Sequence, residues 1–330
     1  MTDVSRPSLG LVMGSAIAPE RIAPAAAMAE ASGFDEVWLA EDFFFTGGVS
    51  GAAGALAATE HLRVGLGVVS AVVRHPALLA MEVSTIGRAN PGRLMAGIGL
   101  GVPAWVRQMR LLPASPVTAL EECVTSVKRL LAGEELTFEG RVFSFDRIRL
   151  EYPDEGAAAS IHMGVIGPNM LRLSGRVADG SVLSVLGSGA YIAWARRRID
   201  EGRASVGRSD HHRITAFAIY SVSDDGAEAR RHARGPVAFH LSHGRNALTD
   251  AYGISDEVEG LVADGSALIH GMPDAWVRDL TIAGTPAECA AGILAYHEAG
   301  ADAVALFPVP SDEIDRIIQM TADDVLPLLR

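Results

Sequence analysis

Residues 62–101, LRVGLGVVSAVVRHPALLAMEVSTIGRANPGRLMAGIGLG, contain two strand–helix units that decide the fold. Short apolar runs at 63–71 and 93–99 predict strands that are buried on both faces, which is typical of parallel sheets. Between them, Pro76 begins a predicted helix over 77–88, because proline is favoured in the first turn of a helix. We therefore expect an α/β fold with a parallel sheet.

The same alternation of apolar runs and alanine-rich helical stretches extends outward in both directions. Further strands are predicted at 8–14, 35–41, 161–166, 180–185, 213–222 and 303–307. Further helices are predicted at 19–31, 51–59, 117–131, 168–177, 190–202, 225–234, 286–299 and 312–329. Strands that are each followed by a helix, eight times over, predict a closed (β/α)8 TIM barrel. An open doubly wound sheet is the alternative.

Two segments do not fit the repeating unit. Residues 136–150 are typical of a hairpin with Glu139 and Gly140 at its turn, and residues 235–282 are predicted to contain several short helical pieces. We interpret both as insertions, at about 135–150 and 235–282, after the fourth and seventh strands. No linker rich in proline or serine separates them, so residues 1–330 are expected to form a single barrel domain.

Composition and charge exclude several classes of function. Of the 330 residues, 40 are Asp or Glu and 28 are Lys or Arg, giving a net charge of -12, so neither nucleic acid nor an anionic membrane is an expected partner. Lys128 is the only lysine and has a solvent-type setting, which argues against Schiff-base chemistry. Cys123 and Cys289 lie in apolar helical runs. Without a signal peptide or spanning segment, we expect a cytoplasmic protein that binds a small molecule.

In a closed barrel, active-site residues follow the carboxyl ends of the strands. Glu41 and Asp42 follow one predicted strand and precede Phe43, so apolar rings would raise the pKa of an acid there, as general acid or base catalysis requires. A solvated loop or helix cap is the alternative. His75 lies after the third strand, where it would either face a ligand or play a structural role.

Two glycine-rich turns bear on the binding of an anion. Gly167, Pro168 and Asn169 lead from a strand into a helix, whose free amides could bind a phosphate. The run from Gly97 to Gly101 lacks the third glycine spacing of a dinucleotide fingerprint, so that interpretation is rejected. The histidines, including His240 and His243 on the second insertion, show no complete metal-ligand spacing, so no metal is expected.

Several segments together resemble the luciferase-like monooxygenase superfamily. They are AEASGFDEVWLAED (29–42), the two units at 62–101, IHMGVIGPNMLRLSGRVADGSVLS (161–184) and AGTPAECAAGILAYHEAGADAVALFP (283–308). The resemblance covers nearly the whole chain. It implies a (β/α)8 barrel, often dimeric, that holds FMN or the deazaflavin coenzyme F-420 (written F420 below).

Within the superfamily the chain is most similar to the F420-dependent branch, which includes methylenetetrahydromethanopterin reductase. The resemblance implies a non-prolyl cis peptide between Gly67 and Val68, in a bulge that supports the deazaflavin ring. Further candidate cofactor contacts lie at the end of the fourth strand and on the turn before the fifth predicted helix. These residues are Gly99, Gly101, Ile166, Gly167, Pro168 and Asn169.

The chain also departs from that branch. Glu41-Asp42 replaces the usual Asp-His, Val12 replaces the acid of the methylene reductases, and Val102 replaces the acid of the sugar-phosphate dehydrogenases. Neither reaction can therefore be transferred directly. Luciferases that use a flavin carry a phosphate-binding arginine near the position of Leu100, and its absence here favours F420.

The sequence thus predicts an F420-dependent oxidoreductase that transfers a hydride to or from a small organic substrate, most simply a reductase. Glu41, Asp42 and His75 are the candidate catalytic residues, and Trp105, Phe43 and His243 are expected to shape the substrate pocket. An FMN-dependent monooxygenase and a non-catalytic cofactor-binding protein are the alternatives.

Overall fold

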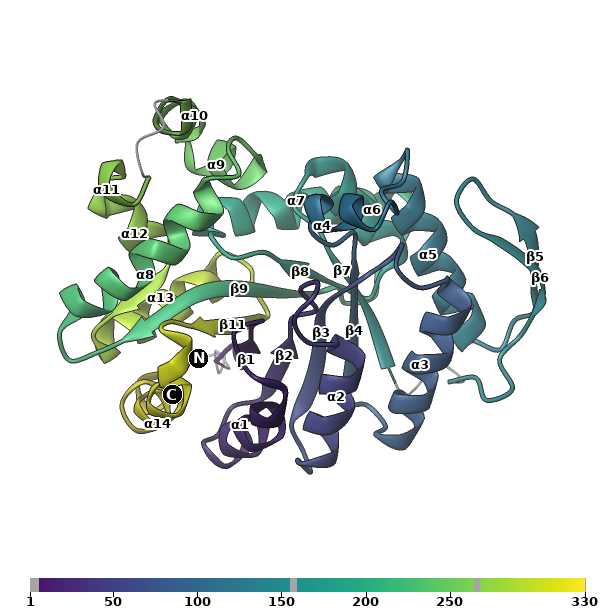
Figure 1. The fold of residues 1–330 in the computed structure, drawn as a ribbon, viewed down its shortest axis with the longest axis horizontal. Coiled ribbons are helices and arrows are strands. Elements are labelled where there is room, and N and C mark those ends of the chain that lie inside the picture. Colours follow the sequence, from purple (N-terminus) through teal and green to yellow (C-terminus); the bar gives the residue numbers. More distant parts are fainter. Residues whose placement is uncertain (1–5, 155–158, 264–267, 330) are drawn as a thin grey trace.

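Eight parallel strands close into a barrel in the computed structural model, which describes residues 6–154, 159–263 and 268–329 (Figure 1). The amino-terminal residues 1–5, considered above for a signal peptide, and residues 264–267 of the second insertion lie outside the described residues. The barrel strands are β1 (Ser8–Met13), β2 (Glu36–Leu39), β3 (Arg63–Ser70), β4 (Leu94–Gly99), β7 (Ala159–Gly164), β8 (Gly180–Leu183), β9 (Arg213–Val222) and β11 (Ala303–Pro308). Pairing of β8 with β9 and of β11 with β1 completes the ring, which confirms the predicted barrel.

Helices follow the strands around the outside of the barrel. They are α1 (Pro19–Ala31), α2 (Gly48–Ala57), α3 (Pro76–Ala89), α5 (Pro116–Leu131), α6 (Pro168–Val177), α7 (Gly189–Ser205), α8 (Gly226–Leu241), α13 (Pro286–Glu298) and α14 (Ile314–Met320). Proline begins α1, α3, α5, α6 and α13, where its missing N–H costs no helical hydrogen bond. No helix within the described ranges is both long and apolar enough to cross a membrane.

The two insertions lie after the fourth and seventh barrel strands, as predicted. The first is the hairpin of β5 (Leu136–Glu139) and β6 (Ser144–Ile148), which projects at one side of the molecule in Figure 1. The second follows α8 and gathers on the opposite side. It consists of α9 (Ala247–Tyr252), α10 (Ser255–Ala263), α11 (Leu268–Gly271) and α12 (Asp274–Leu280).

Four elements differ from the prediction. The expected terminal helix over 312–329 is divided into a 3-10 turn (Ser311–Glu313), α14, a π-helical turn (Thr321–Val325) and a second 3-10 turn (Leu326–Leu329). Helix α8 continues to Leu241 instead of ending at Arg234, because Val237 and Leu241 are buried and tertiary packing outweighs the helix-breaking tendency of Pro236. The short helix α4 (Pro103–Gln108) was not anticipated in the loop after β4. Strand β10 (Ile282–Gly284), too short to show a periodicity, pairs with the end of β9 outside the closed ring.

Two apolar clusters stabilise the barrel. One lies between strands and outer helices and includes alternate strand residues such as Leu11, Val37 and Leu94. The other includes Val12 and Trp38, the intervening residues of the same strands, and it continues into the second insertion. The helices of that insertion therefore pack on the same cluster that fills the barrel.

Trp38 has the largest fully buried side chain of the cluster that fills the barrel. It packs edge-on against Phe217, with ring centroids 5.6 Å apart. A Cβ atom at Gly65 would lie 2.2 Å from the Trp38 ring, so only glycine leaves room for this ring beside β3. Gly65 thus leaves room for the Trp38 ring, which fills the interior of the barrel beneath its mouth.

Candidate active site

The carboxyl ends of the barrel strands bring most of the predicted site residues to one rim, called the mouth below. Glu41 and Asp42 follow β2, and Gly67 and Val68 lie near the end of β3. The remaining residues come from β4 and from the turns after β4 and β7: Gly99, Gly101, Ile166, Gly167, Pro168 and Asn169. Residues far apart in sequence therefore share the mouth because parallel strands end together.

Glu41 is held by an arginine that the sequence analysis did not single out. Nη1 of Arg74 donates to Oε1 of Glu41 at 2.6 Å, and Nη2 donates to Oε2 at 2.9 Å. The backbone N–H of Gly48 donates to the same carboxylate at 3.0 Å. The Glu41 side chain is only 6% exposed. With three donors on its oxygens, Glu41 fixes the loop between β2 and α2, which leaves Asp42 as the acid available for proton transfer.

Asp42 has a different environment from its neighbour. Burial raises the pKa of its carboxyl group above the usual range, and a hydrogen bond with the Ser15 hydroxyl, after β1, opposes part of that shift. No arginine or lysine is among the causes of the shift. A carboxyl group of this kind stays protonated to a higher pH than an ordinary aspartate, as a general acid requires.

The end of β3 forms a raised platform. The Gly67–Val68 peptide is cis, as the family resemblance implied, and the pairing with β4 shifts register between Leu66 and Val69. The Val68 side chain lies over the next two strands, β4 and β7: a Cβ atom would lie 2.5 Å from it at Gly99 and 2.6 Å from it at Gly164. Glycine at both positions lets the Val68 side chain rest directly on the backbone of β4 and β7.

The turn from β7 into α6 leaves helical amides without a side-chain cap. Gly167 is the N-cap residue and makes no capping hydrogen bond, and nothing lies within 4 Å of the position of a Cβ atom there. The carbonyl of Ile166 accepts a hydrogen bond of 2.9 Å from the Tyr191 hydroxyl, which fixes the turn. Pro168 and Asn169 are exposed. This ten-residue helix thus begins in open space that an anionic group could enter.

Aromatic side chains border the mouth beside β2 and β4. The ring centroid of Trp105, on α4, lies 6.3 Å from that of Phe43 and 6.4 Å from that of Phe45. Phe43 is buried, whereas Phe44 and Phe45 are 69% and 63% exposed. The structure therefore brings Phe43 and Trp105 together, as expected for residues of one pocket wall.

His75 and His243 have surroundings that do not favour their predicted roles. The Nδ1 atom of His75 accepts from the N–H of Ala77, and its Nε2 atom lies 3.2 Å from the carbonyl oxygen of Ser144 on the β5–β6 hairpin. Phe145 packs on its ring at 4.9 Å. His75 therefore caps α3 and joins it to the hairpin. His243 is exposed beyond the end of α8, where it contacts Phe239.

A cavity of about 370 Å³ lies between the end of β1, helix α8 and the turn after β11, and we call it the β1–α8 cavity. Its lining residues are Val12, Gly14, Ser15, Ala16, Ile17, His232, Pro236, Phe307, Pro308, Val309, Pro310, Ser311 and Asp312. Ser15 follows the end of β1 and Phe307 lies near the end of β11, so both reach the mouth. Sequence reasoning missed His232, because nothing in a helical pattern indicates that one of its faces borders a barrel mouth.

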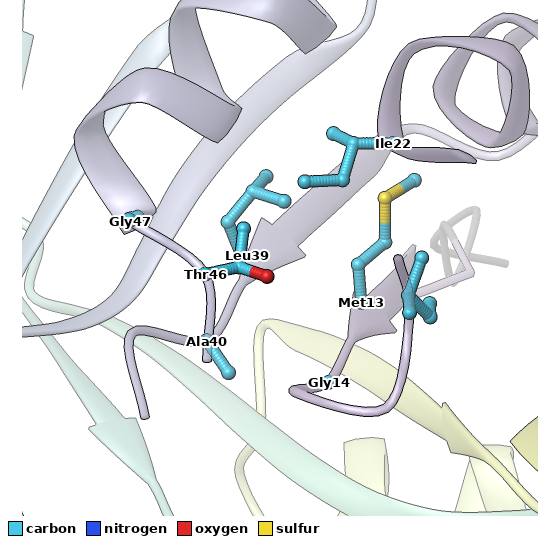
Figure 2. A pocket seen from close by; sticks show the side chains of 9 residues that line it. Met13, Gly14, Ile22, Leu39, Ala40, Thr46 and Gly47 are labelled. Carbon is cyan, nitrogen blue, oxygen red and sulfur yellow. The ribbon is translucent and has the colours of Figure 1, made fainter. Parts of the chain in front are cut away.

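A second, much smaller cleft lies between the ends of β1 and β2. Figure 2 shows Met13, Ile22 and Leu39 gathered there beside the loop that carries Thr46 and Gly47. Its volume of about 10 Å³ has room for about one water molecule, so it is a packing defect and not a ligand site. Within residues 6–154, 159–263 and 268–329, no group of three or more His, Cys, Asp or Glu side chains could hold a metal ion.

The amino-acid sequence is similar to that of one protein family and of several characterised enzymes. A profile of the luciferase-like monooxygenase family matches residues 4–303. The chain is 28% identical over 281 residues to a 5,10-methylenetetrahydromethanopterin reductase of Methanolobus tindarius, covering 83% of this chain and 85% of the relative. It is 27% identical over 330 residues to an F420-dependent glucose-6-phosphate dehydrogenase of Kineococcus radiotolerans, covering 95% and 94%.

Among solved structures, the coenzyme F420-dependent tetrahydromethanopterin reductase of Methanopyrus kandleri superposes with a TM-score of 0.85. The match covers 99% of this chain and 100% of that one at 22% sequence identity. At that identity the superposition establishes a shared barrel architecture.

Proposed function

The chain belongs to the luciferase-like monooxygenase family, and on that premise we propose that it is an F420-dependent oxidoreductase acting on a small organic substrate. The observation that carries the proposal is the platform at the end of β3, where Val68 rests on Gly99 and Gly164. It offers a surface for a flat ring within the mouth that also holds Asp42. The glucose-6-phosphate dehydrogenase relative, which is named for F420 and aligns over 94% of its length, supports the choice of that cofactor.

The residues present fit a flat ring with an anionic tail. Gly67 and Val68 remain partly exposed, so a ring can contact them, and the uncapped start of α6 at Gly167 has open space for a phosphate. When bound, the deazaflavin supplies the hydride or accepts it, because the cofactor carries the redox chemistry in such enzymes.

The chain's own residues supply orientation and a proton. The Glu41–Arg74 ion pair fixes the loop that carries Asp42, and the Asp42 carboxyl group, whose pKa burial raises, donates its proton to the substrate. Phe43 and Trp105 exclude water from that side. A protonated acid assists reduction, because the substrate then gains a proton as well as a hydride. The finer assignments of a reductase, a single functional domain, a homodimer and a cytoplasmic location are parts of this proposal.

Titration of the purified protein with F420 and with FMN, followed by the fluorescence of each cofactor, tests the proposal. We expect saturable binding of F420 with at least tenfold higher affinity than FMN. A Gly54→Ala variant, altered where nothing lies within 4 Å of the new Cβ atom, should bind both cofactors as the unmodified protein does. Tight binding of FMN without binding of F420 would instead indicate a flavin monooxygenase, and light scattering measures whether the protein is dimeric.

A further inference from the structure

The bulge at the end of β3 lies outside the two strand ladders beside it. Pairing of β3 with β2 ends at Leu66, and pairing with β4 passes from Leu66 directly to Val69. Among the described strands, neither β2 nor β4 has a residue in register with Gly67 or Val68. Backbone pairing therefore does not fix how far this segment projects into the barrel. Its position depends on the side chains that pack against it.

Phe217 reaches the bulge from the opposite wall of the barrel. In the order of the ring, β9 lies four strands away from β3 in either direction. A Cβ atom added at Gly67 would lie 2.7 Å from the Cζ atom of Phe217 and 3.2 Å from the Cε3 atom of Trp38. The two rings pack edge-on against each other, with centroids 5.6 Å apart. Gly67 therefore rests on both rings, and we call Trp38 and Phe217 the aromatic floor of the bulge.

The aromatic floor is tightly enclosed. Trp38 is fully buried, and Phe217 is 7% exposed. Strand β3 leaves no space beside Trp38, because a Cβ atom at Gly65 would lie 2.2 Å from its ring. Protein interiors are close-packed, so rings enclosed in this way fix the position of the backbone that rests on them. Gly67 and Val68 are partly exposed at the mouth, and the floor sets the level at which they meet a ligand.

We propose that Phe217 is a positioning residue for the cofactor. Its ring, braced by Trp38, holds Gly67 at the level that presents Val68 to a flat ligand ring. Support of this kind matters because a displacement of about 1 Å is enough to spoil a binding geometry. The proposal rests on the proposed function, because it assigns a residue that supports the cofactor ring of that oxidoreductase. Phe217 acts through the bulge and leaves the chemistry to other groups.

Core packing is the competing interpretation, because Phe217 belongs to the apolar cluster that fills the barrel. Phe34 provides a matched comparison, since it is 5% exposed and belongs to the other apolar cluster. If Phe217 only filled space, Phe217→Leu and Phe34→Leu would behave alike: each would lose stability, and neither would move the bulge. A positioning role predicts that only Phe217→Leu moves it.

Crystal structures of the cofactor-free variants test the positioning role without any ligand. In Phe217→Leu we expect Gly67 and Val68 to move toward the barrel axis by about 1 Å, because the shorter side chain leaves a gap beneath them. Phe217→Tyr adds a hydroxyl group at the Cζ atom and should move Gly67 the opposite way. Phe34→Leu should leave both residues in place. A bulge that stays in place in both Phe217 variants overturns the proposal.

Fluorescence titration with F420 measures the consequence of that movement. We expect F420 affinity to fall at least tenfold in Phe217→Leu and less than twofold in Phe34→Leu, with similar losses of stability in urea denaturation. Adding Gly67→Ala to Phe217→Leu places a methyl group in the vacated space and should recover part of the affinity. Equal losses of affinity in Phe217→Leu and Phe34→Leu would assign the effect to stability and contradict the proposal.

The two measurements separate this proposal from the proposed function. If the unmodified protein does not bind F420, the proposed function fails, and the cofactor-free structures still decide whether Phe217 holds the bulge. If F420 binds to Phe217→Leu as tightly as to the unmodified protein, only the role of Phe217 fails.

Discussion

The Arg74 guanidinium group donates two hydrogen bonds, of 2.6 and 2.9 Å, to the Glu41 carboxylate, which lies 33 residues earlier in the sequence. The pair joins the segment after β3 to the loop after β2. The hydrogen bond to the Glu41 carboxylate raises the pKa of Arg74. The loop that presents Asp42 to the mouth is therefore held by an ion pair at its base.

Removing one charge of this pair should destabilise the protein. Glu41→Gln leaves the Arg74 cation without its nearest counter-ion, and we expect the free energy of unfolding to fall by about 2 kcal/mol, less than for a fully buried pair. Urea denaturation measures the change. Arg21→Met, which breaks a pair whose side chains are 48% and 53% exposed, is the control and should cost under about 1 kcal/mol. Equal losses in the two variants would refute the special role of Arg74.

A methyl group at Gly99 should disturb the platform on which the cofactor is proposed to lie. The new Cβ atom would lie 2.5 Å from the Val68 side chain and force it upward. We expect Gly99→Ala to weaken F420 binding at least tenfold, and Val68→Ala to restore part of the affinity in the double variant. Fluorescence titration provides the measurement. Normal affinity in Gly99→Ala would show that the ring does not contact Val68.

Asp42→Asn should remove the acid without changing its shape. Turnover of a small organic substrate with reduced F420 is expected to fall about 100-fold, the scale of a lost general acid. Because burial raises the pKa of Asp42, the rate of the unmodified enzyme should stay high above the usual aspartate range and fall as pH rises through that pKa. The pH–rate profile measures this limb, which should disappear in the variant. An identical profile in both proteins would assign the proton to another group.

Acid should weaken the fold through His162, which is buried inside the barrel. Burial, with help from the Arg213 charge, lowers its pKa from the ordinary 6.5 to about 4. Between pH 6.5 and about pH 4, this histidine is therefore protonated in the unfolded chain but not in the folded chain. The free energy of unfolding falls as pH falls through this window. For one such group the loss from pH 7 to pH 5 is about 2 kcal/mol.

Urea denaturation at pH 7 and pH 5 measures that loss, and His162→Gln should reduce it. His212, whose pKa burial lowers to about 3, should account for part of the remaining dependence. A His61→Gln control should keep the full dependence because His61 is exposed. The same pH dependence in His162→Gln as in the unmodified protein would exclude His162 as its source.

His75→Ala tests whether His75 is structural or catalytic. Loss of the cap on α3 and of the contact with the β5–β6 hairpin should lower the free energy of unfolding by about 1 to 2 kcal/mol. F420 affinity should change less than twofold. Thermal denaturation and titration give the two values. A loss of turnover at unchanged stability would restore the catalytic interpretation of His75.

The local pattern of the sequence determined the architecture of this protein. The signals are local: each apolar run, each proline at a helix start and each glycine at a strand end can be recognised from a few adjacent residues. Eight such strand–helix units predict a closed barrel as the simplest arrangement. The mouth, and with it Asp42 and Gly167, followed from that architecture, whereas the platform at Val68 was implied by the family resemblance. The same reasoning failed at α8, where burial of Val237 and Leu241 carries the helix past Pro236.

The tertiary structure decided what each candidate side chain does. Glu41 and Asp42 are adjacent acids that the sequence could not distinguish. In the fold, Glu41 pairs with Arg74, whereas Asp42 is half-buried beside Ser15. His75 contacts the β5–β6 hairpin, and His232 lines the β1–α8 cavity. A side chain's chemistry depends on which distant groups share its surroundings, and only the closed chain brings those groups together.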